Sequence, residues 1–137
     1  MLRRIGDSGM GESRIQAIDH IHLEAVRGIE ERMRWFYRDV VGLSEVACDA
    51  DDEFALRFKS ERIEIRVRVA ASPQIGSTAV RLAVGASSLE GIAERLDERK
   101  WGYVVLRGLM WTDRRIETLD PAGHRVALKR HWPTGPI

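Results

Sequence analysis

The segment 18–26 carries two histidines and a glutamate at alternate positions, in the order Ile-Asp-His-Ile-His-Leu-Glu-Ala-Val. Side chains two residues apart lie on the same face of a β-strand, so this alternation predicts a strand with His20, His22 and Glu24 on one face. Imidazole and carboxylate groups bind divalent metals or transfer protons near neutral pH. The alternative is a solvated strand face with two ordinary histidines, and the residues of this segment leave both interpretations open.

The composition is typical of one soluble globular domain, since the 137 residues are 44% hydrophobic and 31% charged. Lysine plus arginine (22) nearly balances aspartate plus glutamate (21), which argues against a general attraction to nucleic acid or to an anionic membrane. No apolar run approaches the roughly 20 residues of a transmembrane helix, and residues 1–14 lack the apolar core of a signal peptide. We therefore expect a cytoplasmic protein without nucleic-acid or membrane partners.

The single cysteine, Cys48, excludes an internal disulfide and fits a reducing compartment. Three aspartates, Asp49, Asp51 and Asp52, follow it closely. Their negative charge disfavours the thiolate, so we do not expect a nucleophilic role for Cys48.

Two segments show the apolar period of a helix, one from Gly28 to Val41 and one from Ser88 to Lys100. A glycine follows each segment, Gly42 and Gly102, and both are predicted to end their helices. In the first helix the period places Phe36 in the core and its neighbours Trp35 and Tyr37 on less buried faces.

Each predicted helix has one alternating strand before it and three after it. The strands are predicted at 18–26, 43–47, 54–58 and 63–69 in the first half, and at 78–84, 103–106, 114–119 and 125–129 in the second. Gly42 and Gly102 differ by 60 positions (102 minus 42), which indicates that the two halves repeat one βαβββ pattern. Residues Asp120-Pro121-Ala122-Gly123 predict a tight turn between the last two strands.

This pattern predicts an α+β fold in which two βαβββ modules form a curved mixed sheet, with helices on the outer face and a concave cup on the other. The expected organisation is a flexible segment 1–14, one domain 15–130 and a tail 131–137. Within the domain, module one covers 15–69, a linker covers 70–77 and module two covers 78–130.

Three sequence motifs, which follow one another along the duplicated pattern, resemble those of a known superfamily. They are Ile-Asp-His-Ile-His-Leu at 18–23, Trp-Phe-Tyr-Arg-Asp-Val-Val-Gly-Leu at 35–43 and Leu-Asp-Pro-Ala-Gly-His-Arg-Val at 119–126. The chain resembles the vicinal oxygen chelate superfamily, which includes glyoxalase I, bleomycin and fosfomycin resistance proteins, and extradiol dioxygenases. The resemblance implies a glyoxalase-like domain, and a homodimer in which two chains complete the cups.

In metal-using members of that superfamily, each half supplies one ligand from its first strand and one carboxylate from its last. Residue by residue, the resemblance places His20 and Glu64 at two of these positions and Ala79 and Ala127 at the other two. An alanine methyl cannot coordinate a metal, so half of the set is missing. We therefore expect no cofactor. The alternative is a divalent ion (Zn, Fe, Mn or Ni) held by His20 and Glu64, with His22 as a weaker third candidate.

Strand alternation also predicts a charged open face of the sheet. Its members are Glu64, Arg66 and Arg68 in the first half and Arg81, Arg125 and Lys129 in the second, with Arg115, Glu117 and the small residues Ala79, Ala83 and Ala127 beside them. Arginines next to small side chains suit an anionic ligand, because guanidinium groups match carboxylate and phosphate oxygens. The alternative is a lattice in which the arginines pair with Glu24, Glu64 and Glu117. Tyr103 begins a predicted strand and is a candidate hydroxyl donor.

Three functions follow as hypotheses. The first is a binding protein that holds a small anionic molecule without a complete metal site, with Arg66, Arg81 and Arg125 around the anion and His20, His22, Glu24, Glu64 and Tyr103 nearby. The second is a metal-dependent lyase, isomerase or dioxygenase that uses His20 and Glu64, with His22 as a further ligand. The third is a metal-free enzyme in which Glu64 or His20 transfers a proton.

Overall fold

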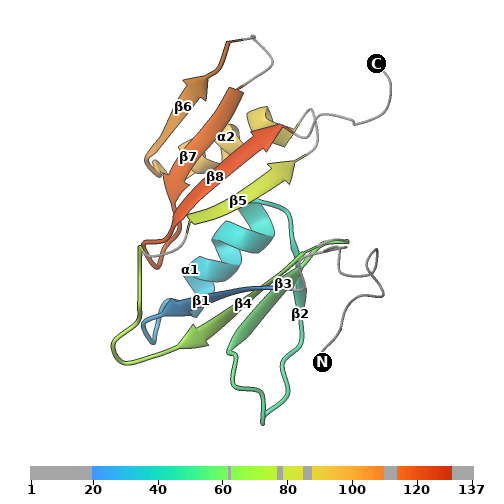
Figure 1. Cartoon of the computed structure of the whole chain (residues 1–137), viewed down its shortest axis with the longest axis vertical. Coiled ribbons are helices and arrows are strands. Elements are labelled where there is room, and N and C mark those ends of the chain that lie inside the picture. The colour runs from blue at the N-terminus through green and yellow to red at the C-terminus, as the bar shows by residue number, and fades with distance from the viewer. Residues whose placement is uncertain (1–19, 62, 77–78, 85–87, 110–113, 131–137) are drawn as a thin grey trace, which may run out of the picture.

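The computed structural model describes residues 20–61, 63–76, 79–84, 88–109 and 114–130 (Figure 1). The first module contains β1 (Ile21–Ala25), α1 (Glu30–Arg34), the π-helix η2 (Trp35–Val40), β2 (Ser44–Val46), β3 (Leu56–Lys59) and β4 (Glu64–Val69). The second contains β5 (Ala79–Val84), α2 (Ser88–Glu98), β6 (Tyr103–Arg107), β7 (Arg114–Leu119) and β8 (Arg125–Arg130). The predicted α+β class and the duplicated βαβββ order are confirmed. The predicted terminal segments 1–14 and 131–137 lie outside the described residues.

Each module forms its own four-stranded sheet, in the orders β1-β4-β3-β2 and β5-β8-β7-β6. In both sheets the first strand pairs in parallel with the fourth, and the other pairs are antiparallel. The register aligns buried side chains, such as Leu23 with Val67 and Leu82 with Leu128. The described strands therefore form two separate sheets of identical topology, whereas the sequence pattern predicts one curved sheet.

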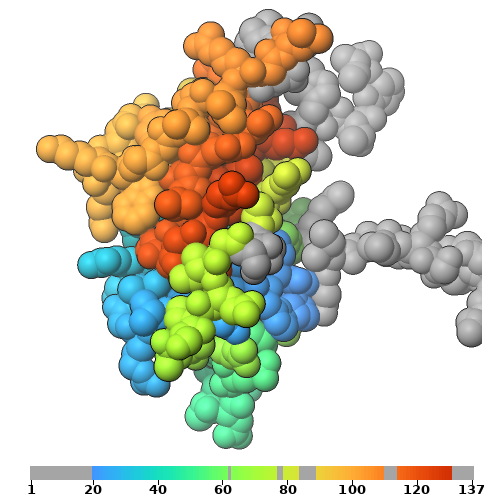
Figure 2. All heavy atoms as spheres, turned by 60° about the vertical axis from the view of Figure 1, so that its left-hand side comes forward, coloured from blue at the N-terminus to red at the C-terminus, as the bar shows by residue number. Residues whose placement is uncertain are grey.

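The helix-covered faces of both sheets share one hydrophobic core. Figure 1 shows α1 between the two sheets, and Figure 2 shows the second module, in orange and red, packed directly on the first, in blue and green. The core cluster includes Phe36 and Val40 from η2 together with Ile65 and Leu128 from the two sheets. Arg95 of α2 donates two hydrogen bonds, of 3.1 and 2.9 Å, to the carbonyl oxygen of Val40. Because the covered faces meet in this core, the open face of each sheet points away from it.

Tyr37 is fully buried, so the prediction of a less buried position for it was wrong. The Val41 N–H donates to the Phe36 carbonyl at 2.9 Å, a five-residue spacing that widens the turn. In this π-helix the adjacent Phe36 and Tyr37 are both fully buried. The Tyr37 hydroxyl donates to Asp120 Oδ2 at 2.6 Å, and burial raises the pKa of both groups.

Backbone geometry confirms Gly42 as the end of the first helix, since its φ is 98°. The second helix ends differently from the prediction. Lys100 has the positive φ (54°), and the Trp101 N–H closes the helix on the Leu96 carbonyl at 2.9 Å. Gly102, predicted to end this helix, lies beyond the closure. No helix among the described residues has the length and apolar character needed to span a membrane.

Candidate functional site

The histidine-bearing face predicted from the sequence is present on β1. The rings of His20 and His22 stack, with centroids 4.2 Å apart and an interplanar angle of 16°. The rings of His22 and Phe54 pack edge to face, with centroids 4.8 Å apart and an interplanar angle of 65°. In the parallel pairing of β1 with β4, His22 lies opposite Arg66, whose guanidinium carbon is 5.6 Å from the centre of the Phe54 ring. The face is thus a row of packed rings beside a cation.

Glu64 on β4 is held by two arginines. Arg57 Nε lies 2.5 Å and Arg66 Nε 3.2 Å from Glu64 Oε2, and the glutamate side chain is only 10% exposed. The hydrogen bond from Arg57, reinforced by Arg66, lowers the pKa of Glu64 from 4.5 to about 2, although burial opposes this shift. A carboxylate this acidic is a fixed anion and a weak general base.

Sequence reasoning missed Arg57. The antiparallel register places Arg57 of β3 directly opposite Arg66 of β4, on the open face of the first sheet. Strand alternation applied to 56–59 would have placed Arg57 on this face, but its contact with Glu64 depends on how β3 aligns with β4.

Glu24 also has an arginine partner. Arg68 Nη2 lies 2.6 Å from Glu24 Oε2, and the Gln74 N–H donates to the other oxygen at 3.0 Å. The contact with Arg68 is the main reason why the pKa of Glu24 is lowered. In the first module, therefore, Arg66 and Arg68 are engaged with carboxylates, as the ion-pair alternative predicted.

The residues at the metal positions of the resemblance do not fit a divalent ion. His20 and Glu64 offer ligand atoms, whereas Ala79 and Ala127 offer none. A cation approaching Glu64 would meet the positive charges of Arg57 and Arg66. Among the described residues, no group of three histidine, cysteine, aspartate or glutamate side chains is placed to hold a metal ion.

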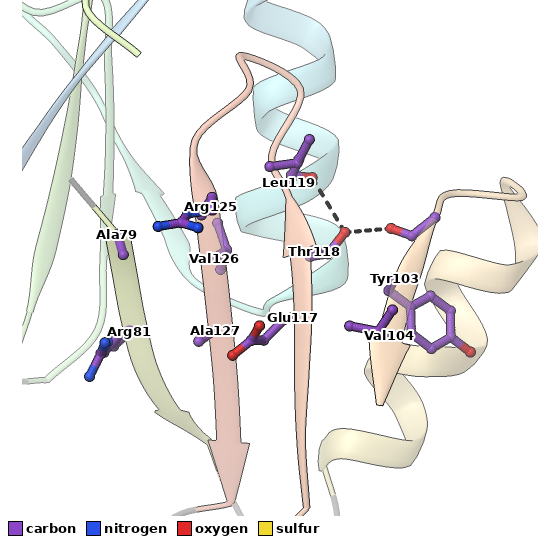
Figure 3. Close-up of a pocket in the computed structure, with 11 residues that line it drawn as sticks. Ala79, Arg81, Tyr103, Val104, Glu117, Thr118, Leu119, Arg125, Val126 and Ala127 are labelled. Atoms are coloured by element: carbon purple, nitrogen blue, oxygen red, sulfur yellow. Dashed lines mark hydrogen bonds between the residues drawn. The ribbon is translucent and has the colours of Figure 1, made fainter. Parts of the chain in front are cut away.

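A pocket of about 560 Å³ lies on the open face of the second sheet (Figure 3). All of the described residues that line it belong to the second module. Ala79 and Arg81 lie on β5, opposite Arg125 and Ala127 of β8 respectively. The two arginines therefore occupy one diagonal of a four-residue square and the two alanine methyls occupy the other.

The two pocket arginines differ from those of the first module. Arg81 and Arg125 are exposed and form no ion pair with any other residue in the described part of the chain. Glu117 supplies a carboxylate to this pocket. Its Oε2 atom lies 3.0 Å from Nε of Arg115 on the same strand. Of the predicted anion-binding set, the structure thus brings Arg81 and Arg125 together, while Arg66 lies in the other module.

Tyr103 lines the same pocket, but its hydroxyl points to the helix-covered side of the sheet. It donates to Asp97 Oδ1 of α2 at 3.0 Å, and this bond raises the pKa of Tyr103. Thr118, opposite Tyr103 in the β6–β7 register, donates to the Gly102 carbonyl at 2.6 Å (Figure 3). Both hydroxyl groups thus form hydrogen bonds at the edge of the pocket. The Tyr103 hydroxyl is directed toward α2, away from Arg81 and Arg125.

Two apolar pocket residues were also missed, Val104 on β6 and Leu119 on β7. Both side chains are about half exposed, at 55% and 50%. Alternation along 103–106 would have placed Val104 on the open face, but only the tertiary structure shows that Val104 lines this pocket.

The surroundings of Cys48 agree with the expectation from its sequence neighbours. Burial, followed by the charge of Asp52, raises the pKa of its thiol, which disfavours the nucleophilic thiolate.

No family model and no curated protein matches the sequence. Solved structures match more than four-fifths of this chain. A protein from Bacillus anthracis that is assigned to the glyoxalase family is 22% identical in sequence to this chain. The match has a TM-score of 0.67 and covers 84% of this chain and 94% of that chain. Lactoylglutathione lyase from Agrobacterium tumefaciens is 20% identical, with a TM-score of 0.65 over 85% of this chain and 94% of that chain.

The fosfomycin resistance protein FosX from Mesorhizobium loti is 15% identical, with a TM-score of 0.64 over 88% of this chain and 97% of that chain. These identities are low, but the topology agrees along nearly the full length of each match. The protein therefore shares the fold of these three solved structures, which is the fold that the resemblance in its sequence implied.

Proposed function

We propose that the protein binds a small anionic molecule in the pocket over β5, β8 and β7, without a complete metal site. The observation that carries this proposal is the pair Arg81 and Arg125, which line the pocket and lack a carboxylate partner among the described residues. Two guanidinium groups offer planar sets of donors that match carboxylate or phosphate oxygens. Because Ala79 and Ala127 have only methyl side chains, they leave room between the two guanidinium groups.

The similar structures support a small molecule as the ligand. Two of them are named for lactoylglutathione and for fosfomycin resistance, and this chain shares their fold along most of its length. The cytoplasmic location and the absence of nucleic-acid and membrane partners stay predictions from composition.

The test is calorimetric titration of the protein with benzoate and with inorganic phosphate. The double substitution Arg81→Ala/Arg125→Ala is expected to weaken binding by at least about tenfold, because it removes charge-assisted hydrogen bonds. Lys129→Ala is the matched control: Lys129 carries the same charge on β8 but does not line the pocket. A similar loss in Lys129→Ala, or no binding of either anion to the unaltered protein, would contradict the proposal.

We further propose that two copies of the chain associate as a homodimer that covers the open faces. Within one chain these faces point away from the shared core, and none of the described residues of the first module lines the pocket. The edge strand β6 and the residues after it also expose apolar side chains, namely Val104, Val105 and Leu109. Exposed apolar edges of this kind are sites of association.

Light scattering during gel filtration measures the assembly. The expected mass is twice the 15.6 kDa of one chain. Leu109→Lys, which places a charge on the most exposed of these side chains, is expected to shift the protein toward the monomer, whereas Val26→Lys after β1 is not. A monomeric mass for the unaltered protein at micromolar concentration would rule out the dimer.

A further inference from the structure

The pocket extends beyond its two arginines along one row of the second sheet. The register aligns Arg81 of β5 with Ala127 of β8, Ala127 with Glu117 of β7, and Glu117 with Val104 of β6. Figure 3 shows Glu117 on the other side of Ala127 from Arg81 and Arg125. A ligand that lies along this row meets positive charge at one end and negative charge at the other.

The carboxylate of Glu117 can accept a further hydrogen bond. Within the described residues its carboxylate is paired with Arg115, whose Nε is bonded to Oε2 at 3.0 Å. Both side chains of this pair are more than two-fifths exposed (43% and 49%), and an exposed ion pair of this kind is weak. In the same part of the chain, Oε1 of Glu117 accepts no hydrogen bond, and Glu117 lines the pocket.

The floor and wall between the two charged ends are apolar. The Ala127 methyl lies between Arg81 and Glu117, and the half-exposed side chains of Val104 and Leu119 flank Glu117. Neighbouring strands lie about 4.8 Å apart, so the backbones of Arg81 and Glu117, two strands apart, are separated by roughly 10 Å. The space over Ala127 between these two strands fits a body of about the size of one ring.

We propose that the ligand is a zwitterion. Its anionic group lies between Arg81 and Arg125, its ammonium group binds Glu117, and a ring-sized apolar body covers Ala127 against Val104 and Leu119. This inference rests on the proposed function, since it adds a second charged end to the same site.

The test compares para-aminomethylbenzoate with para-ethylbenzoate, which has the same shape and the same acid group but no ammonium. The unaltered protein is expected to bind the zwitterion about fivefold more tightly. Glu117→Gln, which keeps the shape of the side chain, is expected to abolish this preference, which is the ratio of the two affinities measured in the same variant. Glu94→Gln, an exposed glutamate on α2, is the matched control and should keep the preference.

The outcomes separate the two proposals. Equal binding of both acids by the unaltered protein, or a preference that survives in Glu117→Gln, would overturn the zwitterion and leave the anion site intact. Failure of both acids to bind would overturn the anion site itself. Thermal unfolding followed by circular dichroism checks that Glu117→Gln is folded, and Glu117→Ala repeats the comparison with a shorter side chain.

Discussion

Glu64 carries its negative charge between two guanidinium groups, and these contacts determine what the residue can do. The resemblance to the vicinal oxygen chelate superfamily places Glu64 at the position of a metal ligand. Without the neighbouring arginines, its carboxylate would also suit a general base. Arg57 and Arg66 instead hold it as a structural anion with a pKa of about 2. The two neighbouring guanidinium groups therefore favour the ionised form of Glu64.

Glu64→Gln is expected to destabilise the protein by about 1–2 kcal/mol near pH 7, since it removes charge-assisted hydrogen bonds. The pKa of Glu64 is lower in the folded state than its ordinary value of 4.5, so the unfolded chain binds the proton more tightly. The stability that Glu64 contributes is therefore fully present above about pH 4.5 and is lost as the pH falls toward 2.

Urea unfolding of the unaltered protein and of Glu64→Gln, near pH 7 and near pH 3, measures this contribution. The unaltered chain is the reference at each pH, and the quantity compared is the difference between the two free energies of unfolding. This difference is expected to narrow at the lower pH. A difference of equal size at both pH values would contradict the role of Glu64 as a paired anion.

The turn between β7 and β8 forms as its residue types predicted. Asp120 Oδ1 accepts the N–H groups of Ala122 and His124, both at 2.9 Å, and Gly123 takes a φ of 103°. Positive φ at this position favours glycine because a Cβ atom would be strained there. The turn also positions Asp120 to receive the Tyr37 hydroxyl.

Gly123→Ala is expected to lower the free energy of unfolding by about 1–2 kcal/mol, because of its positive φ. A Cβ at this position would also lie 3.1 Å from Cγ2 of Ile75. Gly102→Ala is the control, since Gly102 lacks a positive φ and a Cβ there would meet no atom within 4 Å. Chemical denaturation of both variants measures the difference, and equal effects would show that backbone conformation at Gly123 is unimportant.

Contacts between the modules hold the whole molecule together. Tyr37 of η2 binds Asp120 of the β7–β8 turn, and the His124 ring bonds through Nε2 to the Glu24 carbonyl at 2.7 Å. Arg95 of α2 caps the Val40 carbonyl at the end of η2. These contacts join residues 55 to 100 positions apart in the sequence, and they place both helices in one core with the open sheet faces outside.

The sequence by itself determined the two βαβββ modules and the strand faces, because alternation and helical period are local properties of the chain. Only the tertiary structure decided which charges are paired. Glu64 binds Arg57, whereas Arg81 and Arg125 share a pocket without a carboxylate partner among the described residues. Such pairing depends on strand register and on packing between modules, which join residues far apart in the sequence and leave no periodic signal in it.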